Sequence, residues 1–140
     1  MRETWPERPL SRPGTDLYKG SMGTFRVRIE VGASEHERFE PVEVLVDTGA
    51  TYTVLPRTRL EELGVLPHTR APFVLADGSE IELEIGRAWI RIDGREEPTL
   101  VVFGDTALLG AYTLEALRLS PDPVGRRLVP VRALLMRVAA

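Results

Sequence analysis

The most informative part of this sequence is Val42-Glu43-Val44-Leu45-Val46-Asp47-Thr48-Gly49-Ala50. Its first five residues form a nearly continuous apolar run rich in valine, which is typical of a strand buried in a sheet. The run ends abruptly at Asp47, and Gly49 lets the backbone turn tightly two residues later. The stretch therefore predicts a buried strand that ends in a tight turn and sets one ionisable side chain against the core.

Strands joined by tight turns dominate the chain on both sides of this stretch. Apolar residues alternate with arginine and glutamate from Phe25 to Val31, which is the period of a half-buried strand. Similar alternation flanks Asp77-Gly78 and Asp93-Gly94, and Asp-Gly is a strong signal for the turn of a hairpin. Here the second turn joins 89–92 to 99–103, and a last hairpin is expected across 124–129. The pattern predicts an all-β fold.

One or two short helices are expected among the strands. Residues 57–63 follow a proline and precede Gly64, which predicts a helix with a glycine stop. Residues 112–119 carry leucines at helical spacing directly after the apolar step Leu108-Leu109-Gly110.

The two ends of the chain have less definite patterns. Residues 1–22 contain several prolines and glycines among mixed charges and no apolar period, so we expect a flexible leader or arm, native or left by cloning. A single domain is expected over residues 23–140. Within it, residues 131–138 suit a strand and a helix equally.

Composition excludes several classes of protein. The 140 residues suffice for one hydrophobic core but not for two comfortable domains. The net charge of −3 is too close to neutral for the basic field that nucleic-acid binding needs, so we expect no nucleic-acid partner. The chain has no cysteine, and His36 and His68 lack ligand partners at helical spacing. We therefore expect no thiolate nucleophile, no metal and no cofactor.

Targeting and membrane signals are also missing from the sequence. No apolar run reaches the roughly 18 residues of a membrane span. The start MRETWPERPL lacks the apolar core of a signal peptide. We expect a protein without a membrane partner and with a cytoplasmic location.

Asp47 is the one ionisable residue that the sequence sets against the core at the end of a buried strand. A carboxylate in that place is costly unless it is hydrogen-bonded or used. Gly49 lets the backbone approach the carboxylate closely, and the Thr48 hydroxyl can bridge to a neighbouring strand or subunit. From these residues alone two interpretations stay open: Asp47 caps a turn, or it carries chemistry.

The order of motifs resembles that of the retropepsins, the homodimeric aspartic proteases of retroviruses and their bacterial relatives. The resemblance runs roughly from Phe25 to Val131. It rests on the Asp-Thr-Gly-Ala turn after an apolar strand, a hairpin tipped by Asp77-Gly78, and the Leu-Leu-Gly step before a short helix. It implies a single closed, β-barrel-like half domain of an acid protease, in which a hairpin flap closes over the substrate.

The resemblance also implies a role for each matching residue. Asp47 would be the catalytic aspartate, and Thr48 would link the active-site loops of two protomers. Gly49 and Ala50 would complete the loop. The flap tip and the apolar loop under the site would be formed by Ala76, Asp77, Gly78, Ser79, Leu109 and Gly110.

Aspartic protease chemistry needs two carboxyl groups that share one proton. The ionised group takes a proton from water, and the protonated group polarises the carbonyl of the substrate. This chain contains one Asp-Thr-Gly. The second carboxyl must come from another copy related by a twofold axis. The sequence thus predicts a homodimeric aspartic endopeptidase whose substrate is a peptide or protein.

Two other interpretations fit parts of the sequence. A strand followed by Asp, Thr and Gly occurs in phosphate-binding folds of the actin and sugar-kinase type, but those folds need long alternating helices and larger lobes. A non-catalytic dimerising or peptide-binding module on the same fold stays open, because a fold does not guarantee its chemistry. Two departures from the viral pattern are the single glycine of the expected flap tip, Gly78, and a C-terminal tail without an evident match to the viral dimerisation strand.

Overall fold

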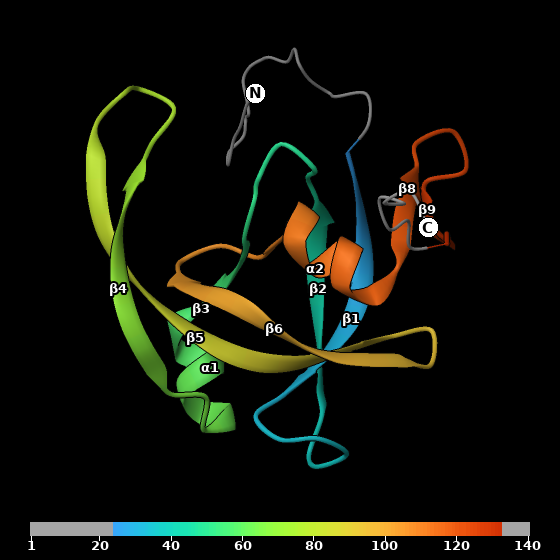
Figure 1. Cartoon of the computed structure of the whole chain (residues 1–140), viewed down its shortest axis with the longest axis horizontal. Coiled ribbons are helices and arrows are strands. Elements are labelled where there is room, and N and C mark those ends of the chain that lie inside the picture. The colour runs from blue at the N-terminus through green and yellow to red at the C-terminus, as the bar shows by residue number, and fades with distance from the viewer. Residues whose placement is uncertain (1–23, 133–140) are drawn as a thin grey trace, which may run out of the picture.

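A computed structural model describes residues 24–132 (Figure 1). The expected arm at 1–22 lies outside the described residues, as does most of the segment 131–138. The elements, in chain order, are β1 (Phe25–Gly32), β2 (Glu40–Val46), β3 (Thr53–Pro56), α1 (Arg57–Leu63), β4 (Pro67–Val74), β5 (Glu80–Ile92), β6 (Arg95–Gly104), β7 (Leu108–Leu109), α2 (Ala111–Leu117), β8 (Leu119–Asp122) and β9 (Arg127–Pro130).

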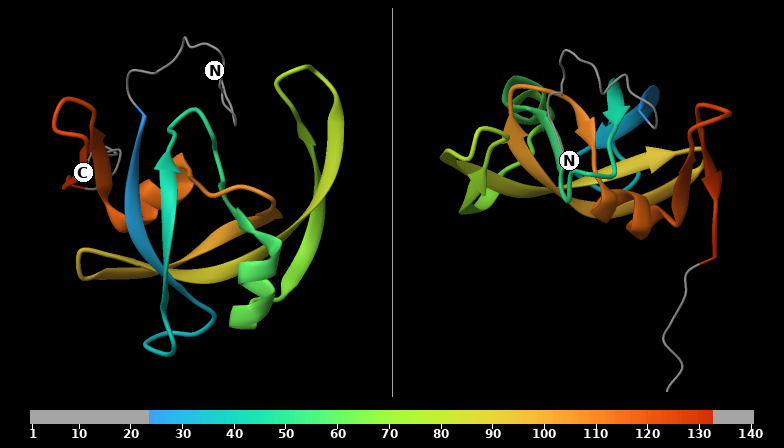
Figure 2. Two further views of the ribbon diagram at one scale, coloured as in Figure 1. Left: turned by 180° about the vertical axis from the view of Figure 1, so that it is seen from behind. Right: turned by 90° about the horizontal axis from the view of Figure 1, so that it is seen from above.

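Six of the strands close into a ring. The hydrogen-bonded order is β1-β2-β7-β3-β6-β5, and β5 pairs again with β1 where residues 89–91 meet 30–32. Strand β4 joins the ring through β5, so the β4–β5 hairpin projects from it as an arm (Figure 1). Strands β8 and β9 form a separate two-stranded sheet on the side away from that arm (Figure 2). The predicted all-β fold with short helices is confirmed.

The ring encloses an apolar core. Alternate residues of β1 and β2 point inward, and Ile29, Val31, Val44 and Val46 are almost completely buried there. The helices each pack one face against this core through leucines, namely Leu60, Leu63, Leu114 and Leu117. Burying these aliphatic side chains is the main favourable contribution to the stability of the fold.

Both Asp-Gly hairpins form as predicted. In the β4–β5 hairpin Gly78 has a φ of 87°. In the β5–β6 hairpin Asp93 and Gly94 have φ values of 50° and 81°, the two positive angles of a type I′ turn. Strand β6 begins directly after this turn at Arg95, several residues earlier than the sequence indicated, because the ladder continues without a break from the pair Ile92 and Arg95.

Helix α2 differs at its ends from the predicted span of 112–119. It begins at Ala111 and stops at Leu117, because Arg118 takes a left-handed conformation with φ 58°. The guanidinium of Arg95 in β6 donates to the carbonyl oxygens of Leu117 and Arg118, each at 2.8 Å. It thereby supplies hydrogen bonds to carbonyl groups that have no partner within the helix at its C-terminal end. Leu119 then starts β8. Neither α1 nor α2, the two helices of the described chain, is long and apolar enough to cross a bilayer.

Candidate active site

Asp47 lies at the point where β2, β7 and β3 come together. It directly follows β2, and the loop of residues 47–52 leads from β2 to β3. Strand β7 lies between these two strands, parallel to β2 and antiparallel to β3, so that Leu108 pairs with both Leu45 and Val54. Both ends of the loop are therefore fixed by the same short strand.

The first half of the loop is folded around the Asp47 carboxylate. The N–H of Asp47 donates to the carbonyl oxygen of Leu109 at 3.0 Å, which continues the ladder between β2 and β7. The N–H of Gly49 donates to Oδ1 of the carboxylate at 2.9 Å, and the N–H of Ala50 donates to the carbonyl oxygen of Asp47 at 3.1 Å. Asp47 and Ala50 are half-buried, whereas Thr48 and Gly49 are exposed. The turn thus holds one oxygen of Asp47 in place at the surface of the core.

The second half of the loop is held by the residues that open α2. Ala111 and Tyr112 donate their N–H groups to the carbonyl oxygens of Ala50 and Thr51, at 2.8 and 2.9 Å. Gly110 lies so close that a Cβ on it would be 2.5 Å from the carbonyl oxygen of Tyr52. Only glycine allows this approach of two backbone segments. The structure therefore brings the predicted pair Leu109 and Gly110 directly beneath the loop, and both are buried.

The predicted flap tip, 76–79, lies at the end of the β4–β5 arm and is exposed. Figure 1 shows this tip and the loop after β2 pointing the same way from the ring, and the reversed view in Figure 2 agrees. The side chain and the N–H of Ser79 both donate to Oδ1 of Asp77, at 2.5 and 2.9 Å. The Asp77 side chain therefore stabilises the turn at the tip through these two hydrogen bonds.

The hydrogen bond from the Ser79 hydroxyl, together with that from its N–H, holds the pKa of Asp77 below its ordinary value. A carboxylate whose folded pKa is lowered stabilises its turn above its ordinary pKa and loses that contribution as the pH falls through the lowered value. The contribution of Asp77 to its turn is therefore lost only at a pH below the ordinary pKa of an aspartate.

An apolar wall connects the loop with the arm. It consists of a second cluster, centred on four buried residues of β3, β5, β6 and β7, with partly buried side chains around them: Val54, Ile85, Val102, Leu108, Leu45, Tyr52, Ala71, Phe73, Leu83 and Leu100. Tyr52 makes an edge-to-face contact with Phe73 of β4 at 5.9 Å between ring centroids and lies 6.2 Å from Tyr112. We call this set the apolar wall.

Sequence reasoning missed two groups of residues near the loop. The first is an aromatic row in which Tyr52 contacts both Phe73, which like Tyr52 belongs to the apolar wall, and Tyr112, which lies outside it. The second consists of three buried threonines, Thr53, Thr99 and Thr113. A hydroxyl at an inward position of an apolar strand, as at Thr53, was a usable signal, because an unbonded polar group in a core is unfavourable.

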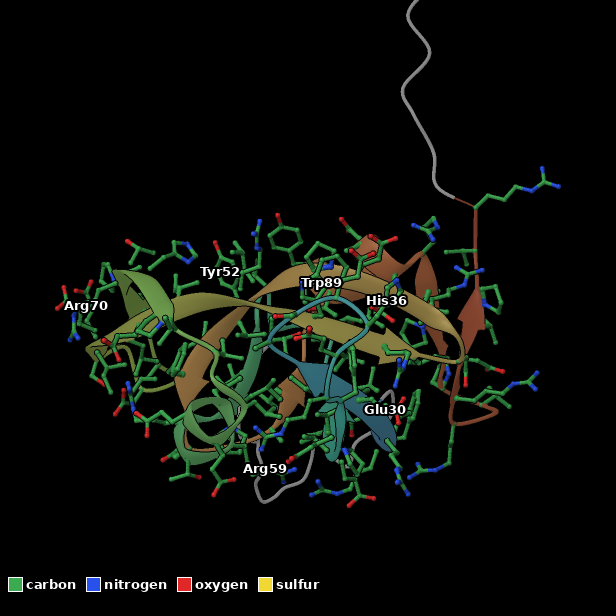
Figure 3. All side chains as sticks on the ribbon, turned by 90° about the horizontal axis from the view of Figure 1, so that it is seen from below. Glu30, His36, Tyr52, Arg59, Arg70 and Trp89 are labelled. Atoms are coloured by element: carbon green, nitrogen blue, oxygen red, sulfur yellow. The ribbon has the colours of Figure 1, made fainter. Side chains whose placement is uncertain are left out.

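The two histidines of the sequence lie apart, His68 in β4 and His36 in the loop between β1 and β2. His36 lies in the β1–β2 loop, opposite the Asp47 loop, and Figure 3 shows it with Glu30 well away from Arg70 of β4. Its Nδ1 is 3.1 Å from a carboxylate oxygen of Glu96 and its Nε2 is 3.3 Å from Glu35. Within residues 24–132, no three or more His, Asp or Glu side chains are grouped so that they could hold a metal ion.

The ring of strands, with the Asp47 loop packed on residues 108–112, is the arrangement that the resemblance to the retropepsins implies. The sequence profile of the aspartyl protease family matches residues 26–113, more than half of the chain. The chain belongs to the aspartyl protease family.

Comparison with solved structures adds a retroviral enzyme. The chain is similar to EIAV protease complexed with the inhibitor HBY-793, with 23% sequence identity and a TM-score of 0.49. The match covers 82% of this chain and 97% of the viral one. No curated protein sequence matches the chain significantly.

Proposed function

We propose that the protein is a homodimeric aspartic endopeptidase in which each protomer contributes Asp47 to one shared site. Membership of the aspartyl protease family supports peptide-bond hydrolysis. The assignment of Asp47 as the catalytic residue rests on the way its loop holds it. Asp47 is half-buried at the end of a buried strand: its backbone N–H donates to the carbonyl oxygen of Leu109, and its carboxylate accepts from the N–H of Gly49. Such a fixed, accessible carboxylate suits general acid and base catalysis.

A second carboxylate is required because one Asp cannot act as base and acid in the same step. Two carboxylates at hydrogen-bond distance cannot both be ionised, so the pair holds one proton in mildly acidic solution. The chain has one Asp-Thr-Gly. Thr48 is exposed beside Asp47 and is available to contact the same loop of a second copy.

Hydrolysis then proceeds through a tetrahedral intermediate. The ionised Asp47 takes a proton from water while the oxygen of that water attacks the peptide carbonyl carbon. The protonated Asp47 of the other protomer gives its proton to the carbonyl oxygen, and a gem-diol forms. In the second step the carboxyl that gained the water proton donates it to the amide nitrogen, and the other carboxylate removes a proton from one hydroxyl of the diol. The C–N bond breaks to release an amine and a carboxylic acid, and the dyad again holds one proton.

The substrate is proposed to be an extended peptide that lies between the Asp47 loop and the β4–β5 arm. The apolar wall lines this side of the ring, with Tyr52 and Phe73 only partly buried. Partly exposed aromatic rings bind apolar side chains by removing their surface from water. Exposed apolar residues of the arm, Val74 and Ile81 among them, are available to cover the peptide.

A cleavage assay with an unfolded protein substrate tests this proposal. We predict turnover that is highest in mildly acidic solution and is blocked by a statine-containing peptide, because a working dyad prefers the tetrahedral hydroxyl to a planar amide. Asp47→Asn should remove activity by at least about 10²-fold, since each general acid or base contributes roughly 10²–10⁴. The turn should persist, because the amide oxygen of asparagine still accepts from the N–H of Gly49.

Asp93→Asn is the matched control. Asp93 lies exposed in the β5–β6 turn, and asparagine tolerates its positive φ. This variant should keep full activity. Undiminished turnover by a folded Asp47→Asn dimer would show that Asp47 does not carry the chemistry. A wild type that binds peptides but never cleaves them would favour the non-catalytic module.

A further inference from the structure

Three threonine hydroxyls form a buried chain behind the candidate site. Thr53 of β3 and Thr113 of α2 are completely buried, and Thr99 of β6 is 4% exposed. Their Oγ1 atoms are linked in series: 2.6 Å separates those of Thr53 and Thr113, and 3.0 Å separates those of Thr113 and Thr99. Thr113 is the middle member and joins two strands of the ring to the first turns of α2.

This hydroxyl chain ends on the segment that holds the Asp47 loop. The N–H of Gly110 donates to Oγ1 of Thr53 at 3.0 Å. The next two N–H groups along the chain, those of Ala111 and Tyr112, hold the carbonyl oxygens of the loop residues Ala50 and Thr51. A shift of residues 110–112 would therefore move the loop directly.

Packing alone does not explain three hydroxyls at these positions. Valine has nearly the shape of threonine and would bury only apolar atoms there, whereas a buried hydroxyl is unfavourable unless it is hydrogen-bonded. A connected network of buried hydrogen bonds also fixes the positions of the groups that it links, because each bond sets the orientation of the next group. Here the network fixes the position of Gly110 and, through Ala111 and Tyr112, the position of the Asp47 loop.

We propose that Thr113 is a positioning residue for catalysis: through Thr53 and Gly110 it sets the place of Asp47 relative to the Asp47 of the second protomer. This inference rests on the proposed shared dyad. The separation of the two carboxyl groups decides how strongly their ionisations are coupled. The arm and the apolar wall, which would bind the peptide, make no hydrogen bond to the Thr113 hydroxyl in the described structure.

The main experiment compares Thr113→Val with Thr113→Ser by steady-state kinetics. We expect the valine variant to lose about ten- to a hundredfold in kcat, since small misplacements of catalytic groups cost this much. KM should stay within about twofold because substrate contacts are kept. The serine variant, which keeps the hydroxyl, should recover most of the rate. Thr58→Val on the exposed side of α1 is the control and should match the wild type.

The pH dependence distinguishes positioning from a merely structural role. If the carboxyl groups move apart in Thr113→Val, their mutual repulsion weakens. The higher apparent pKa of the pair then falls, the lower one rises, and the pH profile of kcat narrows on both sides. Loss of folded dimer alone would lower the rate in proportion and leave the apparent pKa values unchanged, and that result would overturn the proposal.

Two readouts that do not use activity keep this inference separate from the proposed function. Carbon-13 NMR of the Asp47 carboxyl should show coupled, two-step titration in the wild-type dimer, and an uncoupled titration there would reject the shared dyad itself. Amide exchange at Gly110, Ala111 and Tyr112 should become faster in Thr113→Val. A folded Thr113→Val protein with wild-type kcat, pH profile and exchange would overturn the positioning role.

If that variant does not fold, Thr99→Val, which loses only the far hydroxyl, should show the same changes to a smaller extent, and wild-type behaviour there would overturn the proposal.

Discussion

Gly110 is the residue on which the shape of the candidate site depends most directly. We predict that Gly110→Ala lowers activity at least about tenfold and destabilises the fold by about 1–3 kcal/mol, the usual cost of overpacking. The added Cβ would lie 2.5 Å from the carbonyl oxygen of Tyr52 and 2.9 Å from that of Ala50, so the loop backbone must move. Thermal unfolding and cleavage rates measure the two effects.

Gly125→Ala is the matched control for this substitution. A Cβ there would meet Oδ2 of Asp122 at 2.6 Å, a close contact with the end of a side chain in the exposed β8–β9 turn. That side chain can rotate away, and the turn is far from the Asp47 loop (Figure 1). Equal activity losses in the two variants would show that the close approach of Gly110 has no special importance for the site.

Local patterns in the sequence predicted contacts between near neighbours, and the resemblance added the distant pair Leu109 and Gly110, but other contacts between distant residues were missed. Asp47 and Gly49 belong to one turn, so their hydrogen bond follows from local spacing. Thr53 and Thr113 meet across 60 residues, and Tyr52 of the loop meets Phe73 of β4. Such contacts follow from the ring topology, which no local pattern contains.

The β4–β5 arm is the element whose proposed role is easiest to test. We predict that Gly78→Val raises KM and lowers kcat while hardly changing stability. Gly78 has a positive φ of 87° that β-branched residues resist, but a Cβ there meets nothing within 4 Å. The strained tip would no longer close correctly over a peptide. Kinetics and thermal unfolding measured on the same preparation give the answer.

The β5–β6 turn provides the control for the arm. Gly94 has nearly the same φ of 81° and equally open surroundings, but it lies at another hairpin. Gly94→Val should therefore share any small loss of stability and leave the kinetics unchanged. If the two variants have the same kinetic effect, or neither has one, the β4–β5 hairpin is not a flap.

Elements could be predicted from the sequence wherever a local pattern determined them. The alternation in β1 and the Asp-Gly turns gave the right strands and hairpins, because side-chain period and turn geometry are local properties. The end of α2 was wrong by two residues, since Arg118 leaves the helix where Arg95 of β6 caps it. The cap comes from 22 residues away, beyond the reach of helical periodicity.

One protomer contributes only half of the proposed site, and this has two consequences for activity. One chain supplies one Asp-Thr-Gly and one β4–β5 arm. Activity should therefore depend on the concentration of protein as well as on its amount. It should also depend on which chains are paired, because a protomer with a defective loop inactivates its partner.

We predict that specific activity falls on dilution below the dissociation constant of the dimer, because separated protomers hold one carboxylate each.

Mixing tests the same property at constant concentration. When wild type exchanges subunits with an excess of Asp47→Asn chains, most wild-type protomers enter heterodimers with a single carboxylate, so activity should drop well below that of the same amount of wild type alone. An excess of Asp93→Asn chains should produce no drop, since that variant keeps Asp47. Subunit exchange is verified by native mass spectrometry. Unchanged specific activity on both dilution and mixing, with exchange verified, would rule out the shared dyad even though the ring of strands is that of an acid protease.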